Sequence, residues 1–161
     1  MQQPVELAAS AKKVLEAATA LGLPITVREM PQSTRTAEEA AAACGVTVGQ
    51  IVKSLVFAGA GTKKPYLFLV SGKNRVNETA VAAQLGETLT RPDAHFVRDL
   101  TGFAIGGIPP FGHDRALPTY LDSDLLAYDI VWAAAGTPKA VFSVEPARLR
   151  DAIGATVIGV S

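Results

Sequence analysis

The sequence predicts an α/β (α+β) fold in which a mixed β-sheet, curled or closed, has helices packed on its outside. Short apolar runs enriched in β-branched and aromatic residues alternate irregularly with helical segments. Several of these runs are separated by too few residues for a helical crossover, so hairpins must be mixed with longer connections. The 161 residues are 48% hydrophobic and show no repeat or linker, which predicts a single domain over residues 1–161 with a sizeable core.

Helices are expected where apolar residues recur every three or four positions and a capping residue precedes them. These segments are residues 5–21, 36–44, 78–84, 92–102 and 145–153. The first ends at Gly22, and Thr36 and Glu39 form a capping box at the start of the second. Asn77 caps the third, and Pro146 occupies the first turn of the fifth.

Strands are expected in the short apolar runs that lie between these helices. They are residues 25–28, 51–57, 65–70, 89–90, 119–121, 130–133, 141–143 and 156–158. The second and third are joined by a short connection that contains glycine, which predicts a β-hairpin. Lys53 interrupts the first strand of this hairpin and must point either to water or into a pocket. In a pocket its charge is costly unless an anionic or carbonyl group meets it.

A loop over residues 101–113 is too rich in glycine and proline to form a regular element. Glycine allows close backbone approach, and Pro109 and Pro110 stiffen the loop and remove two N–H donors. The remaining N–H groups are able to converge on a carbonyl or an oxyanion, with Gly107 where a substrate approaches the backbone. A tight surface turn is the alternative. Residues 134–138 form either an ordinary hairpin turn or a second wall of the same pocket.

Charge is balanced overall but unevenly placed. The 15 basic and 15 acidic residues give a net charge of +0, which argues against broad salt-driven binding to nucleic acid such as DNA. Between residues 53 and 98, seven basic residues stand against three acidic ones, a local excess of four. This pattern indicates either a solvated face or a modest basic patch beside a pocket for the end of a nucleic acid.

Other features exclude several classes of protein. No apolar run reaches the roughly 18 residues of a membrane span, and the first residues lack the pattern of a signal peptide. The single cysteine, Cys44, excludes an internal disulfide, so a cytoplasmic location is expected. His95 and His113 are the only histidines and show no metal-ligand spacing with Cys or Asp, so neither a metal nor another cofactor is expected.

Three stretches stand in a fixed order along the chain: the strand 51–55, the loop 101–112 and the turn at Ala135-Gly136. Together they resemble the YbaK/EbsC family of freestanding aminoacyl-tRNA deacylases, which are related to the editing domain inserted in bacterial prolyl-tRNA synthetase. The segment 36–41 is also similar to the family's early helix. The resemblance covers residues 5–158 and implies a six- or seven-stranded mixed β-barrel flanked by helices.

The resemblance also implies function, namely hydrolysis in trans of the ester bond of mischarged tRNA, typically tRNA(Pro). Lys53 matches the family's essential lysine, and Gly106 and Gly107 fall in its Gly-x-x-Pro loop, so these three residues are the candidate catalytic set. Pro109 stands where cysteinyl-tRNA(Pro) deacylases commonly have Ser, which favours alanyl or a similarly small aminoacyl group over cysteinyl. The residues expected to contact substrate are Thr34, Ser54, Ile108, Pro109, Pro110, Gly112, His113 and Gly136.

Ester hydrolysis needs a water, a base and stabilisation of an oxyanion. The sequence offers no convincing Ser-His-Asp set, so the substrate's own hydroxyl is the expected base, with Lys53 anchoring the carbonyl or terminal phosphate. The expected partners are the acceptor end of mischarged tRNA and prolyl-tRNA synthetase, without membrane or DNA. Two alternatives stay open: a non-catalytic module that binds a tRNA end or a synthetase, and a hydrolase of a small non-tRNA ester or amide. The feature that distinguishes these alternatives from the deacylase is whether Lys53 faces the same pocket as residues 106–112.

Overall fold

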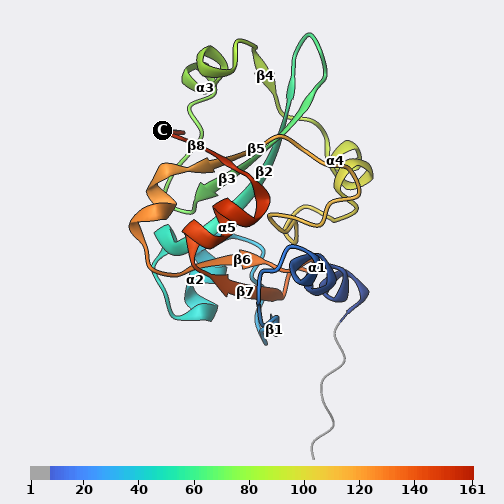
Figure 1. Cartoon of the computed structure of the whole chain (residues 1–161), viewed down its shortest axis with the longest axis vertical. Helices are drawn as coiled ribbons and strands as arrows, with labels where there is room; N and C mark the ends of the chain where they lie inside the picture. The colour runs from blue at the N-terminus through green and yellow to red at the C-terminus, as the bar shows by residue number, and fades with distance from the viewer. Residues whose placement is uncertain (1–7) are drawn as a thin grey trace, which may run out of the picture.

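The computed structural model describes residues 8–161, and its strands are joined in one mixed sheet. The strands are β1 (Arg28–Glu29), β2 (Ile51–Gly59), β3 (Pro65–Ser71), β4 (Leu89–Thr90), β5 (Thr119–Asp122), β6 (Val131–Ala134), β7 (Ala140–Val144) and β8 (Thr156–Ile158). Their order is β1-β7-β6-β2-β3-β5-β8, with β4 paired to β2 outside this path (Figure 1). The predicted mixed sheet is confirmed.

Both kinds of pairing occur in the sheet. Strand β2 pairs antiparallel with β3 and β4 but parallel with β6. Strand β5 lies between β3 and β8 and pairs parallel with both. The sheet has eight strands where the family resemblance implied six or seven, because the two-residue strands β1 and β4 add short bridges at its margins. Strand β1 lies at Arg28–Glu29 and overlaps only the last residue of the expected segment 25–28, because the residues that pair with β7 in the described part of the chain are Arg28 and Glu29.

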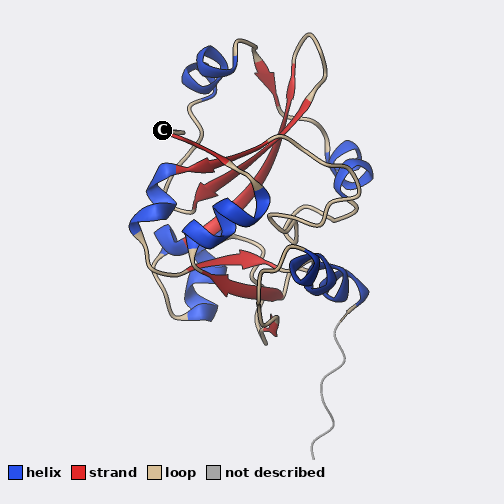
Figure 2. Ribbon diagram, viewed as in Figure 1, coloured by secondary structure: helices blue, strands red, loops and turns tan. Residues whose placement is uncertain are grey.

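Five helices and two short 3-10 helices lie around the strands in the described part of the chain (Figure 2). They are α1 (Ala9–Ala20), α2 (Ala37–Cys44), α3 (Glu78–Leu85), α4 (Ala94–Thr101), α5 (Pro146–Ile153), η1 (Val48–Gln50) and η2 (Ser123–Ala127). The predicted capping box of Thr36 and Glu39 is present, and the Asn77 side chain accepts from the N–H of Ala80. Residues 5–7 of the expected first helix lie outside the described residues. None of the helices in residues 8–161 is long and apolar enough to cross a bilayer.

The hydrophobic core is divided between the two faces of the β2–β3 ribbon. Val52 and Val56 face the larger cluster, which also takes in α1 and the loop around Phe103. Leu55 and Phe57 face a smaller cluster that includes residues of α3. Because side chains alternate along a strand, neighbouring residues of β2 serve different faces. This alternation decides where the two residues between Val52 and Leu55 point.

Candidate active site

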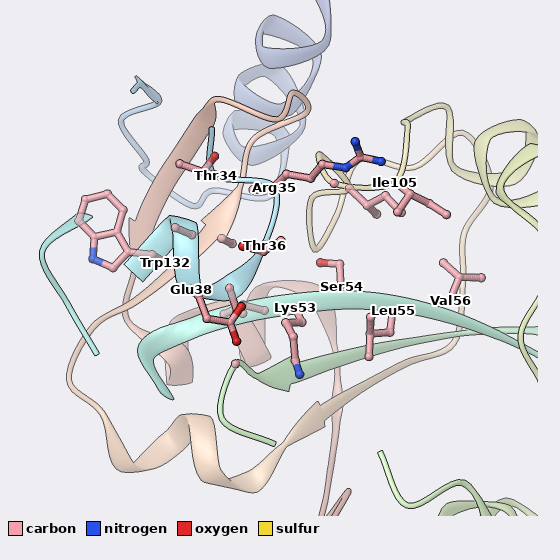
Figure 3. A pocket seen from close by; sticks show the side chains of 18 of the residues that line it. Thr34, Arg35, Thr36, Glu38, Lys53, Ser54, Leu55, Val56, Ile105 and Trp132 are labelled. Atoms are coloured by element: carbon pink, nitrogen blue, oxygen red, sulfur yellow. The ribbon is translucent and has the colours of Figure 1, made fainter. Parts of the chain in front are cut away.

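A cavity of about 730 Å³ opens beside the middle of β2. Its walls come from residues 53–57 of β2, residues 34–38 at the start of α2, the turn 72–75, and Ile105, Gly106 and Ile108 of the glycine-rich loop. Figure 3 shows side chains of residues 34–38 and of Ile105 gathered around Lys53, Ser54, Leu55 and Val56 of β2. Three segments far apart in the sequence therefore meet beside the middle of β2.

The cavity exists because one edge of β2 is only partly paired. On one side, β3 pairs with β2 from Val52 to Ala58. On the other side, β6 meets only Ile51 and Val52, and β4 meets only Ala58 and Gly59. Residues 53–57 have no strand partner on this side within the described residues. The sheet is therefore interrupted beside the centre of its longest strand.

The hydrogen bonds at the two ends of the β2–β3 ribbon show which main-chain groups face this gap. The N–H of Gly72 donates to the carbonyl of Ile51 at 2.7 Å, and the N–H of Gly59 donates to the carbonyl of Lys64 at 2.9 Å. In an antiparallel ladder, residues that exchange hydrogen bonds alternate with residues that do not. The odd-numbered residues of β2 therefore bond to β3, and the even-numbered residues turn their N–H and C=O groups to the opposite edge.

Two even-numbered residues, Ser54 and Val56, face the gap. Their even-numbered neighbours Val52 and Ala58 lie opposite β6 and β4, but no strand lies opposite Ser54 or Val56 in residues 8–161. The Ser54 hydroxyl is also buried and lacks a hydrogen-bond partner, the single such side-chain atom in the described part of the chain. Polar groups buried without partners are uncommon and costly, so this edge has the character of a ligand site.

Lys53 borders the cavity on the opposite face of β2. Figure 3 shows its side chain directed away from that of Ser54. Its ammonium donates to the backbone carbonyl of Asn74 at 2.5 Å. Burial lowers the pKa of Lys53 below its ordinary value, and the nearby carboxylate of Glu38 opposes that effect. Lys53 is therefore held at the cavity wall by a carbonyl group and does not extend freely into bulk water.

The carbonyl that binds Lys53 is fixed by a buried carboxylate. The Asn74 side-chain amide donates to Asp122 and to Asp124, both at 2.8 Å. Asp122 is only 1% exposed and also accepts from the backbone N–H of Ser71 at 3.1 Å and of Asp124 at 3.0 Å. Neither Asn74 nor Asp122 was expected at the site from the sequence. The only signal was a lone Asp at the end of an apolar run, which is equally typical of a cap.

Basic side chains dominate the charged groups of the cavity. They are Arg35, Lys53, Lys73, Arg75 and Arg91, with Glu38 as the one acidic residue among the described lining residues. Much of the predicted local excess of positive charge is thus gathered at the cavity. Lys63 and Lys64 belong to the hairpin connection and Arg98 lies on α4, so these three do not line it. Arg35 was missed because it precedes the basic segment in the sequence.

The glycine-rich loop contributes less to the cavity than the sequence suggested. Of the candidate site residues, those that line the cavity are Thr34, Lys53, Ser54, Gly106 and Ile108. Those that lie outside it are Gly107, Pro109, Pro110, Gly112, His113 and Gly136. The Thr34 hydroxyl already donates to the carbonyl of Pro138 at 3.0 Å. Lys53 and part of the loop do share one cavity, but from different sides of β2.

The expected place of Gly107 beside the substrate is corrected by its surroundings. A Cβ atom at this position would lie 2.9 Å from backbone atoms of Thr137. The Gly107 carbonyl also accepts from the N–H of Gly136 at 2.9 Å, and its own N–H donates to the carbonyl of Ala104 at 3.0 Å. Gly107 is required for close packing of two loops, and its N–H is not available as an oxyanion donor.

Gly112 and Gly136 allow the loop and the neighbouring turn to pack closely against α1, and His113 stabilises the end of the loop. A Cβ at Gly112 would lie 2.9 Å from that of Ala17 in α1, and one at Gly136 would lie 2.6 Å from the carbonyl oxygen of Ser10. His113 shares a hydrogen bond with the carbonyl of Pro109 at 2.7 Å, and burial lowers the pKa of its imidazole. These contacts hold residues 109–113 close to α1 and outside the cavity, while Gly106 and Ile108 of the same loop line it.

Comparison with known proteins agrees with this architecture. Residues 31–152 match the family of aminoacyl-tRNA editing domains, and the chain belongs to that family. It is similar to the "Uncharacterized protein YwhH" of Bacillus subtilis (strain 168), at 30% identity over 125 residues, which cover 78% of this chain and 79% of that protein.

Two further similarities bear on the kind of editing. A protein of Enterococcus faecalis (strain ATCC 700802 / V583), named "Putative Cys-tRNA(Pro)/Cys-tRNA(Cys) deacylase EbsC", is 28% identical over 126 residues, or 71% of this chain and 75% of that protein. A solved structure described as a "putative trans-editing enzyme for prolyl tRNA synthetase" superposes with a TM-score of 0.91 at 51% identity, covering 97% of this chain and 99% of the other. The predicted family resemblance is confirmed.

Replacing Gly107 by alanine is expected to destabilise the fold without removing activity from the molecules that remain folded. The added methyl group must displace the Thr137 backbone, and such overpacking costs about 1–3 kcal/mol. Thermal denaturation and the deacylation rate of the folded fraction measure the two effects separately. Gly61→Ala is the control, because nothing lies within 4 Å of an added Cβ there. If Gly107→Ala has normal stability but no activity, Gly107 lies beside the substrate and its packing role is contradicted.

Asn74→Ala is expected to slow deacylation because the turn loses the side-chain amide that ties it to Asp122 and Asp124, so the backbone carbonyl that binds Lys53 is no longer held in place. A misplacement of about 1 Å in a catalytic group can cost about 100-fold in rate, so a loss of at least tenfold is expected. Asn77→Ala is the matched control: it removes the cap of α3 in the same segment, which costs about 1 kcal/mol of stability, but it touches nothing in the cavity. Equal rates for the two variants would contradict a positioning role for Asn74.

Proposed function

We propose that this protein is a cytoplasmic trans-editing deacylase that hydrolyses tRNA(Pro) charged with a small wrong amino acid such as alanine or cysteine. The observation that carries the proposal is the cavity at β2, which combines Lys53, an unpaired main-chain edge and a basic rim. Membership of the aminoacyl-tRNA editing family supports an aminoacyl-tRNA substrate. The names of the Enterococcus relative and of the structural neighbour support tRNA(Pro).

The reaction is the addition of water to the ester carbonyl that joins the amino acid to the terminal ribose. A tetrahedral oxyanion forms, the bond from carbon to the ribose oxygen breaks, and that oxygen leaves as a hydroxyl after taking up a proton. Ser54 is a poor candidate for a nucleophile, because within residues 8–161 its hydroxyl has no base in hydrogen-bond reach. No histidine lines the cavity in residues 8–161. The adjacent ribose hydroxyl is therefore the proposed base.

We propose that different parts of the substrate lie against different walls of the cavity. Arg75 and Lys73 stand on the turn that also carries Asn74, so the phosphate groups of the acceptor end belong on the Lys53 side of β2. The opposite side carries the apolar residues Val56, Ile105 and Ile108 together with Arg35. An apolar wall of this kind suits a small aminoacyl side chain, although it discriminates single methylene groups by only about 1–3 kcal/mol.

A partner protein completes the proposal. The basic residues that line the cavity are few, and the chain as a whole has a net charge of +0. The proposed protein therefore contacts only a few phosphates of the tRNA. The identity of the tRNA is then read by a partner, for which prolyl-tRNA synthetase is proposed. A non-catalytic tRNA-end binder and a hydrolase of small esters are the competing functions, and hydrolysis assays separate all three.

Lys53→Ala is expected to fold normally and to lose deacylation of the preferred substrate by about 100- to 1,000-fold, the usual cost of removing one electrostatic donor. The measurement is release of labelled amino acid from a panel of mischarged tRNAs that includes alanyl- and cysteinyl-tRNA(Pro). Lys63→Ala in the hairpin connection is the matched control, because that lysine lies outside the cavity. Full activity of Lys53→Ala eliminates the proposed mechanism, and inertness of the unaltered protein on the whole panel eliminates the enzyme.

A mischarged acceptor-stem minihelix is expected to be hydrolysed nearly as well as whole tRNA, because the basic groups gather at a single cavity. Each phosphate contact contributes roughly 0.7–0.9 to the log–log dependence of binding on salt. Two or three contacts therefore predict a slope of about −1.4 to −2.7. An inert minihelix, or a slope several-fold steeper, would show that the protein reads much more of the nucleic acid.

A further inference from the structure

The main-chain groups of Ser54 and Val56 on the unpaired side of β2, here called the β2 gap edge, pair with no strand in residues 8–161. The N–H and C=O groups of both residues face the cavity, and the buried Ser54 hydroxyl beside them has no hydrogen-bond partner in the same part of the chain. Main-chain N–H and C=O groups within a sheet are almost always hydrogen-bonded in proteins, and leaving such groups unpaired is costly where water is excluded. A ligand that matches their donor and acceptor pattern would complete the strand.

We propose that Ser54 binds the α-amino ester of the substrate through its main chain, as if the aminoacyl group were one residue of an added strand. The α-ammonium donates to the Ser54 carbonyl, and the Ser54 N–H donates to the ester carbonyl. This inference rests on the proposed function and names the part of the substrate that the β2 gap edge holds.

The chemistry of an aminoacyl ester fits this edge closely. It carries a nitrogen, a Cα and a carbonyl in the same order as a residue in a strand, and such a residue exchanges two hydrogen bonds with the residue opposite. The ammonium has three donors, so a second one is able to reach the orphan hydroxyl of Ser54. Hydrogen bonds from a charged donor are shorter and about twice as strong as neutral ones. A simple acyl ester lacks this donor altogether.

The pairing also fixes the direction of the substrate's side chain. Residues directly opposite each other in a sheet project to the same face. An L-aminoacyl side chain paired with Ser54 therefore lies on the Ser54 face of β2, which Figure 3 shows turned toward Ile105 and away from the Lys53 side chain. The Ser54 N–H then points at the oxygen that becomes the oxyanion. The N–H of Gly107 does not serve this role, because it donates to the carbonyl of Ala104.

The first experiment varies the substrate on one tRNA and leaves the protein unchanged. L-Alanyl, propionyl and D-alanyl esters are compared, each rate being divided by the spontaneous hydrolysis rate of the same ester. The propionyl ester lacks the ammonium, and a loss of roughly 10- to 100-fold in rate enhancement is expected from one charged hydrogen bond. The D-alanyl ester is expected to react more slowly than the L form because its methyl group points to the Lys53 face. Equal enhancement for alanyl and propionyl esters overturns the inference.

The second experiment removes the main-chain donor. Ser54→Pro deletes an N–H that faces the cavity and makes no bond to β3, which is the kind of position where a strand tolerates proline. A loss of about 100- to 1,000-fold in rate is expected. Ser54→Ala is the matched control, since it removes the hydroxyl but keeps both main-chain groups, and a loss below about tenfold is expected. Equal rates for the two folded variants overturn the inference.

The third experiment detects binding without turnover and remains available if Ser54→Pro fails to fold. Adenosine carrying L-alanine through a 3′-amide is titrated into the labelled protein and compared with its propionyl counterpart by NMR. The amide signal of Ser54 is expected to shift only with the alanyl compound, while that of Leu55, which faces β3, is the internal control. A Ser54 shift in a protein that hydrolyses no mischarged tRNA defeats the proposed function alone. Hydrolysis without the shift defeats the inference alone.

Discussion

The interrupted pairing of β2 is the constraint on which the site depends. A strand buried at the centre of a sheet normally exchanges hydrogen bonds with neighbours on both sides, because unpaired main-chain groups are costly there. Here β6 meets only Ile51 and Val52, and β4 meets only Ala58 and Gly59, so the middle of β2 has no strand partner on that side in residues 8–161. The cavity opens at this interruption, and the main-chain groups of Ser54 and Val56 face it. The contacts that shape the surrounding turn and loops therefore shape the site as well.

Two kinds of interaction maintain the geometry around the gap beside β2. On one side, the carboxylate of Asp122 gathers several donors and fixes the turn whose carbonyl binds Lys53. A buried carboxylate is tolerated only when its lone pairs are satisfied, as they are here. On the other side, glycines bring the loop and the turn at Gly136 against α1 so closely that side chains have no room. The Asp122 network acts through directional hydrogen bonds, whereas the glycines act through close packing.

The sequence predicted the candidate site in part, and the errors share one physical cause. Lys53, Ser54 and Ile108 line the cavity as expected, because an interrupted apolar strand and its partner loop are visible in the pattern. Gly107 was expected beside the substrate, but it packs on the Thr137 backbone. Glycine marks a close approach in either case. Whether the approaching group is a substrate or another part of the chain depends on contacts that the loop's own residues do not encode.

Local interactions explain what the sequence by itself determined. The capping boxes and caps, the helix and strand periods and the hairpin of β2 and β3 all arise between residues close together in the chain, so they were predictable with their limits. The order of the strands, the gap beside β2 and the contact of Asp122 with Asn74 join segments far apart in the chain. Only the tertiary structure decided these, because hydrogen bonds across a sheet depend on which strands meet and where they part.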